Sequence, residues 1–246
     1  MQPQSFRDDA VVEELRALAP DLIVVVAYGK ILPQRVLDIP KLGCINMHAS
    51  ILPELRGSAP VQRAILNHCD EAGVTAMYLS AGMDEGDIIE IRKTVIQPLE
   101  TSEELMARLA DIAAELACDT VRAIENGTAQ RTPQDNAKAT YAPMLTKELS
   151  PIDWTRSARE IDCQVRGLIP WPCAATSVDG KSVKVYETLS GEMTADAPGT
   201  MHAVKRGLSV ACGDGRSLII TQLQAEGGKR MAAADYLRGH PLKTNG

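Results

Sequence analysis

The chain has 246 residues, a formal net charge of −6 at pH 7 and a hydrophobic content of 45%. This length is sufficient for one large domain or two smaller ones. No stretch approaches the ~20 apolar residues that a membrane-spanning helix needs, and we expect no secretory leader. The composition therefore argues against a membrane protein.

The six cysteines lie far apart, and none forms a Cys-x-x-Cys pair. We therefore expect free thiols, as in a cytosolic protein, rather than disulfides. The four histidines lack ligand spacing to any cysteine. The sequence thus predicts neither a structural zinc site nor another metal cofactor.

Positive charge is relatively enriched in the second part of the chain. Residues 1–150 hold 14 Lys and Arg against 22 Asp and Glu, whereas residues 151–246 hold 12 against 10. An acidic protein can still bind a polyanion when its basic side chains gather on one face. This charge balance permits nucleic-acid binding without establishing it.

The first half of the chain alternates helix-like and strand-like segments. Residues 22–27 form an apolar, β-branched run that is typical of a parallel strand buried on both faces. Thr101 and Glu104 form a capping box that opens a long helix, which Asn126-Gly127 ends. This alternation predicts an α/β domain over 1–127 with an open, mostly parallel sheet. The predicted strands cover 22–27, 43–47, 74–79 and 88–96, and the predicted helices cover 8–19, 60–66 and 101–126.

Apolar periodicity fades from residue 128 to residue 150, and we interpret this segment as a linker. One helix is predicted beyond it, over 157–168. Short strands joined by Gly-containing turns follow and predict a small β-barrel over 151–240, with the oligonucleotide-binding (OB) type as the natural candidate. These strands are predicted over 182–188, 199–204, 208–212 and 217–223.

Asn46 and His48 lie two residues apart at the end of a predicted strand, so both side chains face the same side. Alone, such a pair is more often a strand end beside a hydrogen-bonded core histidine. The run Ser50-Ile51-Leu52-Pro53 and the later Asp84-Glu85-Gly86-Asp87 favour a catalytic interpretation. An amide, an imidazole and a carboxylate suit an acyl-type transfer without a covalent intermediate. The amide stabilises an oxyanion, the imidazole moves a proton, and the carboxylate orients the imidazole.

The order Asn-x-His-x-Ser-hydrophobic-Leu-Pro, followed by Asp-x-Gly-Asp, closely resembles the folate-dependent formyltransferases. The resemblance implies a Rossmann-like domain that transfers formyl from 10-formyltetrahydrofolate to the amino group of methionine on initiator tRNA, by direct attack of the amine. Asn46 matches the amide that holds the formyl oxygen, and His48 matches the imidazole that protonates the leaving nitrogen. Asp84 matches the carboxylate that pairs with the histidine. Cys44 is interpreted as a packed apolar residue rather than a nucleophile.

The resemblance also assigns binding residues. Arg56 matches a basic loop position near the amine substrate and is a candidate tRNA contact. Two basic pairs in barrel turns, Lys205-Arg206 and Lys229-Arg230, are candidate phosphate contacts, although such pairs are more often solvated surface. No membrane contact and no obligate protein partner is implied. The folate site would be lined by Ser50, Ile51, Leu52 and Pro53, with Tyr28 and Gly29 either as the opposite wall or as a plain strand exit.

Three alternatives remain open on sequence alone. Enzymes that formylate a nucleotide-linked amino sugar share the Asn-His-Asp set, and formylation of glycinamide ribonucleotide is a further option. A non-catalytic folate- or tRNA-binding remnant belongs to a different class.

The family usually carries a first strand and a basic loop ahead of the segment that begins here near Gln2. We therefore expect the apolar strand over 22–27 to expose an edge that is prone to pairing.

Overall fold

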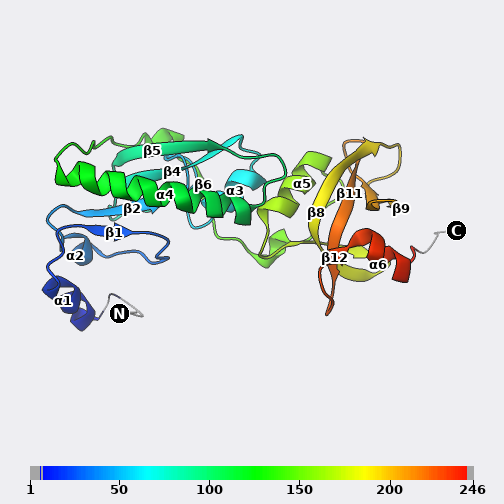
Figure 1. The fold of residues 1–246 in the computed structure, drawn as a ribbon, viewed down its shortest axis with the longest axis horizontal. Coiled ribbons are helices and arrows are strands. Elements are labelled where there is room, and N and C mark those ends of the chain that lie inside the picture. Colours follow the sequence, from blue (N-terminus) through cyan, green and yellow to red (C-terminus); the bar gives the residue numbers. More distant parts are fainter. Residues whose placement is uncertain (1–5, 7, 243–246) are drawn as a thin grey trace. The chain divides into compact units, whose positions relative to one another are not determined.

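The computed structural model describes residue 6 and residues 8–242, and its contacts divide the chain into two compact units. The first unit comprises the residues up to 61, together with 70–96 and 106–144. The second unit comprises 62–69, 97–105 and, within the described residues, 145–242. Each unit has a sheet of its own, and Figure 1 labels most of the strands.

The first unit is built on a four-stranded sheet in the order β1-β2-β4-β5. The strands are β1 (Ile23–Val25), β2 (Cys44–His48), β4 (Glu71–Tyr78) and β5 (Ile88–Val95). β1 and β2 are parallel, whereas β4 runs antiparallel to both β2 and β5. The predicted α/β class is confirmed, and the sheet is mixed rather than mostly parallel. Residues 79–87 between β4 and β5 are too few for a parallel crossover, which takes about a dozen residues or more.

Four helices alternate with these strands along the chain: α1 (Asp9–Ala17), α2 (Gln34–Leu37), α3 (Pro60–Leu66) and α4 (Ser102–Glu125). Most of α3 and the first turn of α4 are counted with the second unit. α4 lies along β5, where Arg92 Nη2 is 2.7 Å from Asp119 Oδ2 and Arg108 Nη1 donates to Thr94 Oγ1 at 2.6 Å (Figure 1). None of the helices in the described part of the chain has the length and apolar character needed to cross a bilayer.

Both ends of α4 agree with the sequence prediction. At its start, Thr101 N donates to Glu104 Oε2 at 2.8 Å, while Glu104 N donates back to Thr101 Oγ1 at 3.3 Å. Beyond its end, Gly127 has a φ of +69°, which an L side chain rarely adopts. The capping box and the glycine stop are therefore confirmed.

β1 is an edge strand in the described part of the chain, because β2 is its one paired neighbour there. It ends at Val25, two residues earlier than predicted, since Ala27 and Gly29 have φ values of +48° and +73° that turn the chain. The side chains of Val24 and Val26 are 42% and 56% exposed. An apolar edge of this kind can pair with another strand.

The segment 128–144, part of the predicted linker, belongs to the first unit. It is attached to the sheet where Thr132 and Ile88 exchange backbone hydrogen bonds of 2.8 and 2.9 Å. It is attached again where β6 (Tyr141–Ala142) pairs in parallel with β3 (Arg56–Gly57). A short 3-10 helix, Asn136–Lys138, lies between these two points.

The second unit contains an antiparallel sheet in the order β7-β8-β11-β10-β9, with β12 also paired to β11. Its core holds Val185, Leu208, Ile220 and Leu223, all fully or almost fully buried, together with Tyr236 from the last helix. The described strand pairs do not join β7 to β9, so closure into an OB-type barrel stays a prediction. The elements are a 3-10 helix (Lys147–Leu149), α5 (Ala158–Gly167), β7 (Ala174–Val178), β8 (Lys181–Met193), β9 (Met201–Val204), β10 (Gly207–Ala211), β11 (Arg216–Ala225), β12 (Met231–Ala232) and α6 (Ala233–Gly239).

Candidate active site

β2 carries the candidate amide and imidazole at its carboxyl end. Ile45 and Met47 are 0% and 5% exposed, and Asn46 and His48 alternate with them on the opposite face. Asn46 is half-buried, and its side chain makes no hydrogen bond with another described residue. Its amide N–H groups are therefore free to bind a ligand oxygen.

The imidazole of His48 is buried between two oxygen atoms. Its Nε2 lies 3.0 Å from the carbonyl oxygen of Leu55, and its Nδ1 lies 3.6 Å from Asp84 Oδ2. The His48 side chain is 7% exposed, so the ring has little room to rotate. This arrangement fixes the ring plane and turns one nitrogen towards the carboxylate.

Asp84 reaches the histidine from the loop between β4 and β5. Its Oδ2 accepts a hydrogen bond of 2.9 Å from the backbone N–H of Gly57, and its side chain is 17% exposed. Its φ of +51° places a non-glycine residue in the left-handed region. The carboxylate is thus held by β3 while it faces His48.

The loop that follows β2 is fixed by its own hydrogen bonds. Ser50 Oγ donates to Glu54 O at 2.6 Å, and the hydroxyl of Thr75 bridges Ser50 O and Leu52 N at 2.7 and 3.1 Å. Ser50 and Leu52 are each 2% exposed. The side chains of Ser50 and Leu52 therefore support the loop from inside, and the folate contacts predicted for these two residues, which would be made by backbone groups, stay a prediction. The half-buried Ile51 and Pro53 are its accessible members.

Tyr28 and Gly29 follow β1, whose carboxyl end lies at the same edge of the sheet as that of β2 because the two strands are parallel. The Tyr28 side chain is 39% exposed, and its ring centroid lies 6.0 Å from that of Phe6. A Cβ built on Gly29 would meet no atom within 4 Å. This turn leaves open space beside the candidate site.

Arg56, the candidate tRNA contact beside Gly57, is buried inside the first unit. It is 2% exposed, and its guanidinium donates to Gln134 Oε1 at 2.7 and 3.1 Å and to Asn136 Oδ1 at 2.8 Å. A contact with a tRNA phosphate would require these bonds to break. These bonds give Arg56 an internal role, and its contact with tRNA stays a prediction.

Cys44 lies on the same face of β2 as Asn46 and His48 but is 3% exposed. Burial raises the pKa of its thiol to about 11, and the negative charge of Asp38 acts in the same direction. Since the thiolate is the reactive form, this residue is a poor nucleophile. Within residue 6 and residues 8–242, no cluster of three or more His, Cys, Asp or Glu side chains is arranged to hold a metal ion.

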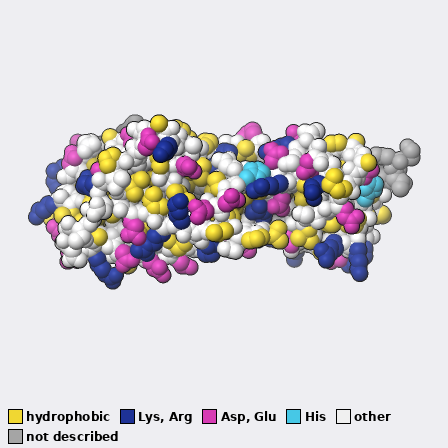
Figure 2. Space-filling view, turned by 90° about the horizontal axis from the view of Figure 1, so that it is seen from above, with side chains coloured by type: hydrophobic (Ala, Val, Ile, Leu, Met, Phe, Trp, Pro, Cys, Tyr) yellow, Lys and Arg dark blue, Asp and Glu magenta, His cyan; other side chains and the backbone are white. Residues whose placement is uncertain are grey.

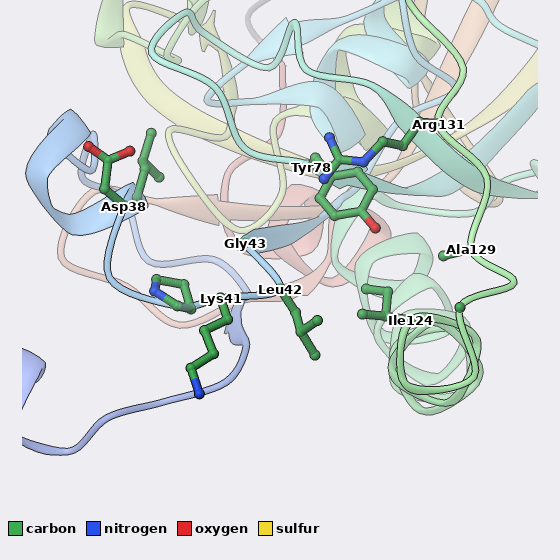
Figure 3. Close-up of a pocket in the computed structure, with 11 residues that line it drawn as sticks. Asp38, Lys41, Leu42, Gly43, Tyr78, Ile124, Ala129 and Arg131 are labelled. Atoms are coloured by element: carbon green, nitrogen blue, oxygen red, sulfur yellow. The ribbon is translucent and has the colours of Figure 1, made fainter.

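A separate hollow of about 450 Å³ opens at the other end of β2 (Figure 3). Gly43, which immediately precedes β2, lines it together with Leu42 and Ile124. The guanidinium of Arg131 stacks at 3.6 Å over the ring of Tyr78, as Figure 3 shows. Because this hollow lies at the amino end of β2, it is not part of the site formed by the residues at the carboxyl end.

The sequence matches two family models, "Formyl transferase" over residues 1–121 and "Formyl transferase, C-terminal domain" over residues 144–241. The methionyl-tRNA formyltransferase of Geotalea uraniireducens is 47% identical over 98% of this chain and 77% of its own length. That of Citrifermentans bemidjiense is 45% identical over 100% of this chain and 77% of its own length. The chain belongs to the methionyl-tRNA formyltransferase family.

Solved structures with the same fold are more distant in sequence. HypX from Aquifex aeolicus in complex with tetrahydrofolic acid has a TM-score of 0.70 at 22% identity, covering 93% of this chain and 40% of HypX. An N-formyltransferase from Helicobacter canadensis in complex with folinic acid and dTDP-3-aminofucose has a TM-score of 0.64 at 20% identity, covering 78% of this chain and 70% of that one. At these identities the likeness shows the formyltransferase fold alone.

Apart from Arg56, the predicted tRNA-binding residues of this methionyl-tRNA formyltransferase family member lie in two exposed turns of the second unit. Arg230 is anchored, with its guanidinium 4.8 Å from the Tyr186 ring centroid and its Nε donating to Gln222 Oε1 at 2.6 Å. In the described structure Lys205, Arg206 and Lys229 form no ion pair. Basic and acidic side chains are interspersed on the face shown in Figure 2.

Both basic turns lie towards the same end of the second sheet. Leu208 at the start of β10 pairs with Ile220, and β12 pairs further along β11 at Gln222 and Leu223. The β9–β10 turn, with Lys205 and Arg206, and the β11–β12 turn, with Lys229 and Arg230, therefore flank the same half of β11. The prediction of a joint phosphate-binding surface is compatible with this arrangement.

Sequence reasoning did not identify the residues that hold the catalytic candidates of this formyltransferase. Leu55 and Gly57 contact His48 and Asp84 through backbone atoms, which carry no side-chain signal. Gln134 donates to the backbone of Asp84 from 50 residues away in the sequence. No local pattern could connect these positions, because the link is formed by tertiary contacts.

Proposed function

We propose that the chain transfers a formyl group from 10-formyltetrahydrofolate to the amino group of methionine on initiator tRNA. The observation that carries this proposal is the buried His48 ring, held between Leu55 O and Asp84 Oδ2 beside the unbonded amide of Asn46. Membership of the methionyl-tRNA formyltransferase family supports the choice of acceptor. The tRNA contacts are proposed for Lys205, Arg206, Lys229 and Arg230.

Asn46 is assigned to the formyl oxygen. Attack of the amine on the formyl carbon places negative charge on that oxygen, and an amide N–H can stabilise the charge as it develops. The side chain of Asn46 is not committed to another described residue. It can therefore donate to the oxyanion without first breaking a hydrogen bond within the protein.

His48 and Asp84 are assigned to proton transfer. The incoming amine must lose a proton, and the folate nitrogen must gain one as its bond to the formyl carbon breaks. Asp84, whose side chain is 17% exposed, is assigned to take the proton from the amine, and His48 Nδ1, the ring nitrogen that does not face Leu55 O, is assigned to protonate the folate nitrogen. The 3.6 Å separation of His48 Nδ1 and Asp84 Oδ2 is longer than a hydrogen bond, and closure of this gap on substrate binding is expected.

The folate cosubstrate is placed between the loop after β2 and the turn after β1. Ile51 and Pro53 supply half-buried apolar surface on one side, and Tyr28 supplies an aromatic ring beside the open space at Gly29 on the other. Apolar and aromatic surface of this kind suits a flat heteroaromatic ligand. Polar recognition is then supplied by Asn46 and His48.

The test is a formyl-transfer assay with 10-formyltetrahydrofolate and three acceptors. Initiator tRNA charged with methionine is the proposed acceptor, uncharged initiator tRNA is the negative control, and a nucleotide-linked amino sugar represents the alternative. We expect formyl-methionine to form on the charged tRNA and on neither of the other acceptors. The His48→Ala variant should form no formyl-methionine. Preferential formylation of the sugar, or no transfer by a folded protein, would overturn the proposal.

A further inference from the structure

A side-chain network connects the buried Arg56 to the turn that carries Asp84. Gln134 lies at its centre, and the Gln134 amide nitrogen donates to Asp84 O at 2.9 Å and to Gly86 O at 2.8 Å. The Gln134 amide oxygen accepts two bonds, of 2.7 and 3.1 Å, from Arg56. One side chain thus joins β3 to the Asp-x-Gly-Asp turn.

The turn requires such a restraint because its backbone is strained. Asp84 has a φ of +51°, a conformation that costs a non-glycine residue free energy and persists where the surroundings enforce it. A Cβ at the neighbouring Gly86 would lie 1.9 Å from Tyr78 O, so the turn is also packed closely against β4. The two bonds from Gln134 hold the carbonyl groups on both sides of Glu85.

Arg56 determines which way the amide of Gln134 points. A guanidinium can only donate hydrogen bonds, so the Gln134 oxygen must face it and the nitrogen must face the two carbonyls. Arg56 is itself 2% exposed and fixed by Asn136 Oδ1 at 2.8 Å, with Glu85 Oε2 at 4.0 Å. The orientation of Gln134 is therefore set from inside the protein.

The main chain near Gln134 is anchored as well. Thr132, two residues earlier, exchanges hydrogen bonds with Ile88 at the start of β5. Ile88 directly follows the Asp84–Asp87 turn. Residues 84–88 are therefore held twice, by the side chain of Gln134 and by the backbone of Thr132.

We propose that Gln134 is a positioning residue for formyl transfer. It holds the turn at 84–86 in the conformation in which the Asp84 carboxylate reaches Gly57 N and His48, and Arg56 orients it for this task. This inference rests on the proposed function, in which Asp84 takes part in proton transfer. It also makes a structural claim that can be measured without activity.

The kinetic test compares Gln134→Ala and Gln134→Glu with Gln130→Glu, an exposed glutamine in the same segment. Gln134→Glu retains the acceptor for Arg56 but turns a carboxylate towards two carbonyl oxygens, so it removes the turn-facing half of the bridge alone. We expect both Gln134 variants to lower kcat by up to about 100-fold with little change in KM, because misplacement by 1 Å can cost that much. Gln130→Glu should behave as the unmodified chain.

A double-mutant cycle assigns the effect to Asp84. If Gln134 acts through Asp84, Gln134→Ala should cause little further loss of kcat in an Asp84→Ala background. An equal loss in both backgrounds, or a kcat for both Gln134 variants that matches Gln130→Glu, would overturn the proposal.

The activity-independent readout is the NMR resonance of the Gly57 amide, whose proton is donated to Asp84 Oδ2. Gln134→Glu and Gln134→Ala should shift this resonance in the direction seen for Asp84→Ala, whereas Gln130→Glu should leave it in place. An unchanged Gly57 resonance in folded Gln134 variants would overturn the inference. If the unmodified chain transfers no formyl group, the proposed function fails, and this measurement still decides whether Gln134 holds the turn.

Discussion

His48 and Asp84 are held against each other by the backbone of one short strand, β3, and by the residue before it. Leu55 O lies 3.0 Å from the ring of His48, and Gly57 N donates to Asp84 at 2.9 Å. Leu55 and Gly57 have φ values of +57° and +118°, so the backbone departs from an extended strand at both contact residues. β3 itself pairs with β6. Movement of this strand would displace both partners at once.

Gly57→Ala should disturb this support directly. The residue has a φ of +118°, and an added Cβ would lie 2.8 Å from Ala142 O, a backbone atom that cannot move aside cheaply. We expect a loss of about 1–3 kcal/mol in the free energy of unfolding, together with a lower kcat. Urea denaturation and formyl-transfer assays would measure the two effects.

Gly127→Ala is the matched control for this prediction. Its φ is also positive, at +69°, but an added Cβ would meet no atom within 4 Å. It should therefore lose stability through backbone strain while retaining kcat. A Gly57→Ala protein with normal kcat would show that β3 does not position the pair.

Asn46→Ala should lower kcat by roughly 10²–10³, which is the usual cost of removing one oxyanion donor. The fold should persist, because the Asn46 side chain makes no hydrogen bond within the described structure. Single-turnover kinetics and circular dichroism would test both statements. Asn67→Ala, at an exposed asparagine, is the control, and equal activity of the two variants would refute the oxyanion assignment.

The sequence was sufficient to place Asn46 and His48 on one face of a strand, because strand periodicity is a local property. The caps of α4 were predictable for the same reason, since Thr101 and Glu104 lie within one turn. The mixed sheet could also be anticipated from the short β4–β5 loop. Alternation of helices and strands predicts the α/β class, whereas the direction of each strand depends on the length of its connection.

The internal role of Arg56 could not be derived from local sequence. An arginine beside a glycine in a loop usually lies on the surface, and its burial here depends on Gln134, 78 residues later. The two-residue strands β3 and β6 are likewise too short to leave a periodic pattern. Both features arise where distant segments meet, so they need the tertiary structure.

Burial of Cys44 should make the free energy of unfolding depend on pH in the alkaline range. Burial raises the pKa of its thiol from 9.0 to about 11. Between these values the unfolded chain loses the proton while the folded chain retains it, so the free energy of unfolding falls as pH rises. Cys44 should contribute a decline of at most about 1.4 kcal/mol per pH unit to the free energy of unfolding. Its contribution to stability is lost as the pH rises through 11.

Cys44→Ala should flatten this decline, as measured by urea denaturation across the same pH window. Cys118→Ala is the control, because Cys118 is exposed. Cys212, whose pKa is also raised to about 11 by burial, should leave a residual slope in the Cys44 variant. A Cys44→Ala protein with the same slope as the unmodified chain would contradict the assignment.

The salt dependence of tRNA binding tests the two basic turns of the second unit. Each phosphate contact releases counterions and adds roughly 0.7–0.9 to the slope of log affinity against log salt. Lys205→Glu and Lys229→Glu remove exposed charges that form no ion pair in the described structure, whereas Arg230 also packs on Tyr186. The Lys205/Lys229 double variant should therefore reduce the slope and weaken tRNA binding while leaving folate binding unchanged.

Arg216→Glu is the matched control for these lysines. Arg216 is exposed at the start of β11, at the opposite end of the strand from the two basic turns. Charge reversal there changes the net charge of the protein by the same amount per site, so it measures the general electrostatic effect. If filter binding at several salt concentrations gave the same slope change per site for Arg216→Glu as for the lysine variants, the phosphate contacts would not reside in these turns. The tRNA would then have to be bound elsewhere on the protein.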